Sequence, residues 1–359
     1  MIQYLSVSLG LNVLLVFVPV ALGLVLLGAD PRLIFFTSAV AIVPLASLMG
    51  KATEQLASRV GAGLGAFLNA SLGNAAELII AIAALREGLH DMVKASITGS
   101  IIGNILLVLG LAMVAGGLRH ERQRFNQTAA GMGASLLLLS AVGLLVPALY
   151  HVIASEQGLR VERELSVDIS AVLFTIYLFS LVFSLKTHRH LYAGTADLST
   201  KAGHQTWGLG RAIGLLVVVT VGIAVMSECL VGAVQPAAER LGLTQVFVGV
   251  ILVALVGNAA EHSTAVLVAM KNQMDLAFGI AVGSSLQVAL FVAPVLVFAS
   301  YLLGAPMDLI FTPFEVAAVT VSVLIVGFIS MDGESHWMEG VMLVGVYLML
   351  AIAFYFLPA

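Results

Sequence analysis

Charged residues and cysteine are both scarce in this chain. Only 10% of its 359 residues are charged, 16 basic and 20 acidic, and Cys229 is the single cysteine. One cysteine permits no intramolecular disulfide, and it cannot build a thiolate metal site, which needs about four ligands. A net charge of −4 leaves no basic face for nucleic acid. The composition therefore excludes disulfide scaffolds, zinc–thiolate centres and nucleic-acid binding.

Apolar residues are in excess instead. They make up 60% of the chain, with a mean hydropathy of +1.08, whereas an ordinary soluble domain is about half apolar and about a quarter charged. The first apolar run has neither a basic start nor a small-residue cleavage site, so we interpret it as a retained helix. Because a membrane helix needs about 20 apolar residues, the sequence predicts an all-α integral membrane protein with about eleven transmembrane helices, at residues 5–27, 33–57, 64–86, 95–117, 126–150, 167–185, 211–234, 245–270, 276–302, 311–331 and 338–357.

The loops on the two sides of the membrane differ in basic charge. Ten of the 16 Lys and Arg residues fall on the side of the N-terminus, and the positive-inside rule places that side in the cytoplasm. The longest polar stretch, residues 186–210, also lies there and is predicted to be a linker. Its histidines, His188, His190 and His204, could bind a metal or sense pH, but a solvated loop is the simpler interpretation.

A repeated motif indicates an internal duplication. The string Gly73-Asn74-Ala75-Ala76-Glu77 recurs as Gly257-Asn258-Ala259-Ala260-Glu261, 184 residues later. The same spacing relates Gly99-Ser100 to Gly283-Ser284, and a spacing of 185 relates residues 54–56 to residues 239–241 in two of three positions.

The duplication predicts how the chain is divided. We expect a leading helix in residues 1–30, a five-helix repeat in 31–185, the linker in 186–210 and a second five-helix repeat in 211–359. An odd number of helices per repeat places the two copies in opposite orientations. Many secondary transporters have this architecture, with the binding site between the repeats near the membrane midplane.

The repeated acids carry the strongest functional signal. A carboxylate within the membrane costs about 2.5–3.5 kcal/mol, and neither Glu77 nor Glu261 has a Lys or Arg near it in its own span. Asn74 and Asn258 each precede the acid by three residues, so each pair is expected on one helix face. Such oxygens suit Ca²⁺. Two adjacent carboxylates also cannot both stay ionised without a cation, so they would bind protons when the metal leaves.

Other polar residues of the spans extend this predicted site. Each of them alone is explained as a helix-packing hydrogen bond, but together they offer further oxygen ligands: Ser100 and Asn104 in the fourth span, and Ser284, Ser285 and Gln287 in the ninth. His262 follows Glu261 and could relay protons or simply pack, since Leu78 stands at its counterpart. Glu228, in the seventh span, could line the ion route or form a structural hydrogen bond.

These residues resemble a known group of transporters. Residues 73–80, 98–110, 257–262 and 283–292 are similar to the cation/proton exchanger (CAX) family of the Ca²⁺/cation antiporter superfamily, and the similarity covers nearly the whole chain. The resemblance implies a Ca²⁺/H⁺ antiporter of eleven helices without a cofactor, in which Ca²⁺ is the substrate and the second and seventh helices slide to gate access. It implies that Ca²⁺ and protons share Glu77 and Glu261, and that the site also includes Asn74, Asn258, Ser100, Ser284 and Gln287.

The sequence departs from that family in two places. The linker has one acid, Asp197, and lacks the acidic regulatory helix of eukaryotic relatives, which favours a prokaryotic-type protein of the inner (plasma) membrane. Gly103-Asn104 stands where relatives often carry Ser-Asn, which removes one hydroxyl ligand. Neither departure touches the two acids.

Three other functions are weighed against antiport of Ca²⁺ and H⁺. A Na⁺/Ca²⁺ exchanger typically has hydroxyl residues in the repeated motif, where this chain has alanines. An intramembrane hydrolase could use the two acids as a dyad, but the sequence has no His-Glu-x-x-His or Gly-x-Ser-x-Gly motif. A cation channel with an acidic ring is the third. The sequence leaves open whether the protein forms a homo-oligomer.

Overall fold

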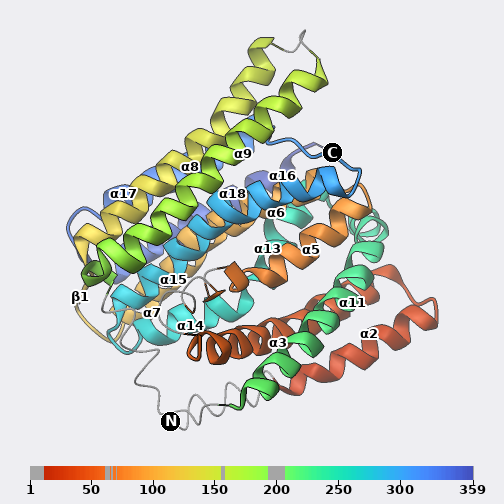
Figure 1. Cartoon of the computed structure of the whole chain (residues 1–359), viewed down its shortest axis with the longest axis horizontal. Coiled ribbons are helices and arrows are strands. Elements are labelled where there is room, and N and C mark those ends of the chain that lie inside the picture. Colours follow the sequence, from red (N-terminus) through yellow and green to blue (C-terminus); the bar gives the residue numbers. More distant parts are fainter. Residues whose placement is uncertain are drawn as a thin grey trace.

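The protein is a bundle of helices, most of them long, in which one group of helices flanks a central set (Figure 1). The computed structural model describes residues 12–60, 65, 68–69, 71–154, 158–192 and 207–358. Four of its segments are π-helical: η2, η4, η6 and η7. In chain order the elements are η1 (Leu14–Val16), α2 (Phe17–Leu26), α3 (Pro31–Ala57), α5 (Ala75–Arg86), α6 (His90–Ile102), η2 (Gly103–Val108), α7 (Leu109–Gly117), β1 (Gln123–Arg124), α8 (Gln127–Ala154), α9 (Leu159–Val182), η4 (Phe183–Thr187), η5 (Arg189–Tyr192), α11 (Leu209–Leu241), α12 (Gln245–Phe247), η6 (Val248–Val253), α13 (Ala254–Gly257), α14 (Ala259–Ala269), α15 (Met274–Gln287), η7 (Val288–Val292), α16 (Ala293–Leu302), α17 (Pro313–Ile329), β2 (Glu334–Ser335) and α18 (Trp337–Phe356).

Long apolar helices account for most of the predicted spans. Within the described ranges, seven helices are long and apolar enough to cross a membrane, or eight if the bent pair Gln245–Gly257 and Glu261–Ala269 is one span. The helices Leu14–Leu26 and Pro313–Ile329 are apolar but shorter. Each of the eleven predicted spans contains a helix, while the number of membrane crossings stays a prediction.

Two local features differ from the sequence prediction. First, α9 begins at Leu159 instead of residue 167, because its polar first turns are helical too and are supported by the Arg160–Glu164 ion pair (2.8 Å). Hydropathy marks the depth of the bilayer, not the end of a helix. Second, β1 and β2 pair as antiparallel strands, Gln123 opposite Ser335, so the fold is not strictly all-α. A pairing of two-residue strands in polar loops has no periodic signal.

Helices α3 and α11 pack against each other, and an ion pair joins them at one end. Asp30 is the N-cap of α3 and accepts a hydrogen bond from the backbone N–H of Arg32. It also pairs with Arg240 near the end of α11 (3.0 Å). The hydrogen bond and charge of the Arg32 guanidinium hold the pKa of Asp30 well below its usual range. The carboxylate therefore stays ionised and keeps both arginines.

The structural elements repeat with the spacing of the sequence motif. Helices α3 and α11 end at residues 57 and 241, α5 and α14 begin at 75 and 259, and α6 and α15 begin at 90 and 274. Each pair is 184 residues apart. The π-helical segments η2 and η7 follow α6 and α15 in the same way. The duplication seen in the motif thus extends to helix boundaries.

The equivalent spans His90–Gly117 and Met274–Leu302 run in opposite directions. The first begins beside the end of the second, since the His90 ring contacts the carbonyl of Ala305 (3.1 Å). It ends beside the start of the second, where the His120 ring contacts the carbonyl of Met270 (3.4 Å). We call the end of the bundle with His90 and Lys94 the Lys94 face, and the end with β1 and β2 the β face.

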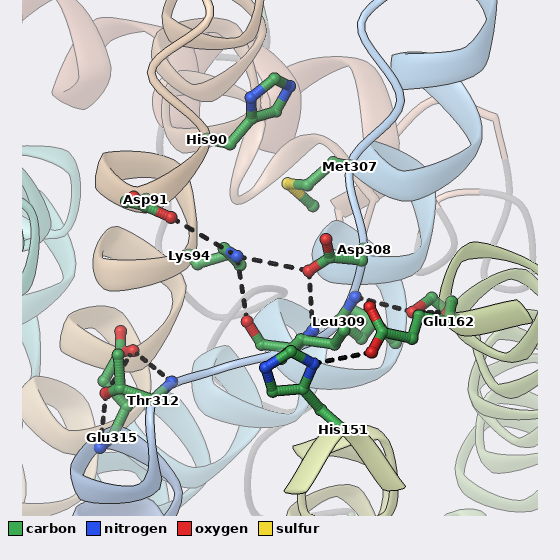
Figure 2. Close-up of polar contacts among 12 residues, drawn as sticks. His90, Asp91, Lys94, His151, Glu162, Met307, Asp308, Leu309, Thr312 and Glu315 are labelled. Atoms are coloured by element: carbon green, nitrogen blue, oxygen red, sulfur yellow. Dashed lines mark hydrogen bonds and ion pairs between the residues drawn. The ribbon is translucent and has the colours of Figure 1, made fainter. Parts of the chain in front are cut away.

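A charged cluster fastens α6 at the Lys94 face (Figure 2). The Nζ of Lys94 lies 3.3 Å from Asp308 and donates to the carbonyl of Ile310 (2.9 Å). One turn further along α6, the Thr98 hydroxyl donates to Glu315 at the start of α17 (3.3 Å). Because these groups are largely buried and satisfy one another, they bind α6 firmly to the α16–α17 loop and to α17.

Thr312 and Glu315 form a capping box at the start of α17. We expect Thr312→Ala to lower the free energy of unfolding by about 0.5–2 kcal/mol, the usual cost of losing an N-cap. The measurement is the midpoint of thermal unfolding in detergent. Thr320→Ala is the control, because the Thr320 hydroxyl only donates back to the carbonyl of Val316 within the same helix. Equal losses in the two variants would contradict the capping assignment.

Candidate cation site

The repeated motifs lie at equivalent helix starts. Asn74 precedes α5 and Asn258 precedes α14, and neither has α-helical backbone angles or a side-chain cap bond. Glu77 and Glu261 follow in the first turns, where the helix dipole favours negative charge. At the second motif the helices on either side of the break meet at an angle of 63°. The motif thus breaks the helix, and the asparagine amides are free for other partners.

The amide of Asn74 makes contacts with the second half of the chain. Its Nδ2 donates to Oε1 of Gln287 (2.8 Å), and its Oδ1 accepts a hydrogen bond from the hydroxyl of Ser284 (3.3 Å). Both partners lie on α15. Asn74 and Ser284 are buried, at 1% and 4% exposure. The asparagine of the first motif is therefore held by the other repeat.

The network continues through Asn104 to the second motif. Nδ2 of Asn104 donates to Oγ of Ser284 (2.9 Å) and to Oδ1 of Asn258 (3.3 Å). Nδ2 of Asn258 donates in turn to Oγ of Ser100 (3.0 Å). All of these bonds join a residue before the linker to one after it. The structure thus brings together all six of the hydroxyl and amide residues predicted for the site.

The two glutamates lie close to each other and to this network. A Cβ placed on Gly257 would be 2.9 Å from Cγ of Glu77, so the first acid lies against the second motif. Glu77 is near enough to Glu261 for their charges to interact, and Glu261 hydrogen bonds with Ser284. Oε2 of each carboxyl group is buried and has no hydrogen-bond partner among the described residues. Two such groups need a cation or a proton.

The donor set is suited to a hard divalent cation. In the described part of the chain, no group of three or more His, Cys, Asp and Glu residues is placed to hold a metal, so further ligands beside the two acids would be neutral. Amide, hydroxyl and backbone oxygens are present in the network. Two carboxylates with neutral oxygens balance the charge of Ca²⁺, which takes six to eight oxygen ligands.

A small pocket adjoins the network on the side of His262. Ser100, Asn258, His262 and Tyr347 are among the residues that line it. Nε2 of His262 is buried and has no hydrogen-bond partner within the described residues. Sequence reasoning missed Tyr347, because a single tyrosine in the apolar α18 carries no signal of a site 89 residues earlier in the chain.

Two other candidates lie in different surroundings. Glu228 does not join the network; its carboxylate pairs with Arg86 on α5 (3.0 Å), and both side chains are at least half exposed. Ser285 donates to the backbone carbonyls of Ala281 and Ile101, which is the helix-packing role considered for it. Neither contact involves Glu77 or Glu261.

The linker histidines are only partly described. The ring of His188 stacks on Phe183 with centroids 4.1 Å apart, and the ring of His190 lies 5.9 Å from that of His188. His204 and Asp197 fall outside the described residues. A metal-binding or pH-sensing role for these histidines stays a prediction.

Comparison with known proteins identifies the family. The family model described as sodium/calcium exchanger protein matches residues 32–186 and 211–356. The chain belongs to this family. It is 47% identical to a Ca²⁺/H⁺ antiporter of Synechocystis sp., over 96% of this chain and 97% of the relative. It is 43% identical to the Ca²⁺/H⁺ antiporter ChaA of Bacillus subtilis, over 90% and 92%. The resemblance to cation/proton exchangers is confirmed.

Solved structures of the family agree with the fold. The native structure of YfkE superposes with a TM-score of 0.84 at 39% identity, covering 97% of this chain and 100% of the other. The crystal structure of the H⁺/Ca²⁺ exchanger CAX superposes with a TM-score of 0.68 at 14% identity, over 97% and 91%. That second likeness concerns the fold alone. The chain is an integral membrane protein with the fold of these exchangers.

Proposed function

We propose that this protein exchanges Ca²⁺ for H⁺ across a membrane by alternating access. The observation that carries the proposal is the meeting of Glu77 and Glu261, one from each half, at equivalent helix starts beside a buried amide and hydroxyl network. Relatives that match nearly the whole chain are named Ca²⁺/H⁺ antiporters, which supports the same activity.

Competition for the two acids provides the coupling. With both carboxylates ionised, the site attracts Ca²⁺, and the neutral oxygens of Asn74, Asn258 and Ser284 complete its coordination. When Ca²⁺ leaves, repulsion between the carboxylates favours protonation, which neutralises the site for the return step. Because each ion excludes the other, neither can pass without the other being carried back. His262, beside Glu261 and without a described partner, is proposed to pass protons to it.

The remaining residues are assigned by their position. Ser100, Asn104 and Gln287 are proposed to ligate Ca²⁺ or to orient the asparagines, because they hydrogen bond to the motif amides or to Ser284. Glu228 is proposed to handle protons at the bundle surface, since its partner is the exposed Arg86. It would act outside the network.

We also propose the architecture of a leading helix and two inverted five-helix repeats, eleven crossings in all. Support comes from the 184-residue spacing of the helix boundaries, from the opposite directions of His90–Gly117 and Met274–Leu302, and from the family model, which matches each half separately. The charge bias places the β face and the N-terminus in the cytoplasm of a prokaryotic cell, with the protein in the inner (plasma) membrane.

Transport in proteoliposomes tests the function. We expect an acid-inside pH gradient to drive Ca²⁺ uptake, and a protonophore or ammonium to stop it by collapsing the gradient. A Na⁺ gradient at equal pH is expected to drive none, whereas a Na⁺/Ca²⁺ exchanger would respond to it. Passive Ca²⁺ flux without any gradient of H⁺ or Na⁺ would indicate a channel. Either of these last two results overturns the proposal.

A further inference from the structure

Two backbones touch where α6 crosses η6. A Cβ placed on Gly99 would be 2.0 Å from the carbonyl oxygen of Val250, and one placed on Gly249 would be 2.7 Å from the carbonyl oxygen of Met92 and from Cβ of Ala95. All five residues are buried. Such close approach of helices in a membrane requires residues without side chains. The crossing joins the two repeats and is sealed.

The equivalent position in the second repeat is open. Gly283 is the counterpart of Gly99, 184 residues later, and a Cβ placed on it would meet no atom of the described residues within 4 Å. Gly283 is partly exposed, and Gly279, the counterpart of the buried Ala95, is exposed. The same asymmetry holds at the motifs, where Gly257 is buried and Gly73 is exposed.

The sealed and open positions flank the cation site on opposite sides. Gly99 directly precedes Ser100, and Gly283 directly precedes Ser284, so each glycine borders the network. The α6 crossing lies between the network and the Lys94 face. The α15 position lies between the network and the β face, because the equivalent spans run in opposite directions.

We propose that Gly99 and Gly283 form two alternating seals, of which only the seal at Gly99 is closed in this structure. In the opposite state the crossing at Gly99 opens, and Gly283 makes the equivalent close crossing near Gly65, the counterpart of Gly249. This inference rests on the proposed function, because only a protein that alternates access needs a seal on each side. Under the proposed orientation, the described state opens to the cytoplasm.

The charged cluster of Figure 2 indicates which wall of the seal moves. Lys94 and Thr98 fasten α6 to Asp308 and Glu315 on the same side as the seal. The opposing wall, η6, lies between α12 and α13 and leads into the break at Asn258. Opening therefore moves η6 away from α6, and α6 stays in place.

Alanine at each glycine has opposite effects in this scheme. Gly99→Ala forces the described state apart, since its Cβ would collide with backbone that has no room to yield. Gly283→Ala leaves the described state intact because space is available, but it blocks the closed crossing of the other state. Both variants stop turnover, and each traps the protein in a different state.

Labelling of introduced cysteines distinguishes the two states. In a Cys229→Ser background, Met92→Cys reports on the α6 crossing and Leu276→Cys on its counterpart, with a maleimide in detergent as the probe. We expect Gly99→Ala to raise the labelling rate of Met92→Cys by about tenfold or more, since a minor state holds about 0.1–10% of the population, and to lower that of Leu276→Cys. Gly283→Ala is expected to leave the fast labelling of Leu276→Cys unchanged or faster.

Transport by the same variants completes the test. Both glycine variants are expected to lose ΔpH-driven Ca²⁺ uptake, while Gly232→Ala, at an exposed position with no described atom within 4 Å, keeps it. Uptake by Gly283→Ala at the wild-type rate overturns the proposal, and so does a shift of both labelling rates in one direction by both variants. If the wild type carried no Ca²⁺, the proposed function would fail, but the labelling would still report whether the seals alternate.

Discussion

Glu77→Gln and Glu261→Gln are each expected to abolish ΔpH-driven Ca²⁺ uptake. Glutamine keeps the size of the side chain but removes one of the two negative charges that the site offers a divalent cation. Removal of one partner from a buried charge interaction costs about 3–5 kcal/mol, which is about a hundredfold or more in affinity. The variant also loses a group that alternates between cation and proton, so coupling fails together with binding.

Two measurements separate a loss of the site from a loss of the fold. Ca²⁺ uptake is followed in proteoliposomes, and the thermal unfolding midpoint in detergent is recorded for the same preparations. The midpoint is expected to stay the same or rise, since the repulsion between the acids is removed. His188→Ala is the control and is expected to transport normally, because its ring only stacks on Phe183 and contacts Thr187. Normal transport by both glutamine variants would refute the site assignment.

The sequence located the polar residues of the site but not their partners. Asn and Glu are costly within a membrane, so their repetition at a fixed spacing stands out against an apolar background. The bonds between them depend on how two distant spans cross. Asn104 donates to both Ser284 and Asn258, yet its own counterpart is Val288, and a repeat alone could not foretell this asymmetry.

Contacts between residues far apart in the chain explain the other differences. Glu228 was considered for the ion route because acids are rare in membrane spans, but its partner Arg86 lies 142 residues earlier. Hydropathy also placed Glu315 at the end of a span, where an exposed acid is expected. Its burial at 3% exposure results from the Thr312 cap and from Thr98, and neither contact leaves a pattern in hydropathy.

Gly257→Leu is expected to reduce Ca²⁺ uptake by about a hundredfold, because displacement of a reacting group by about 1 Å can cost that much. Gly257 is buried, and the side chain of Glu77 occupies the space where its Cβ would be. A leucine there pushes the carboxylate of the first motif away from the second. Initial rates of ΔpH-driven uptake at saturating and limiting Ca²⁺ measure whether the loss lies in affinity or in turnover.

A shorter acid distinguishes displacement of Glu77 from general damage to the fold. Glu77→Asp alone is expected to slow uptake, since the carboxylate is drawn back from Glu261. Combined with Gly257→Leu, it makes room for the leucine, so the double variant is expected to transport better than Gly257→Leu alone; this non-additivity is typical of residues in direct contact. Gly232→Leu, at an exposed position of α11, keeps wild-type uptake. If the aspartate only deepens the defect of Gly257→Leu, steric placement of Glu77 is not the role of Gly257, and the glycine serves the helix break itself.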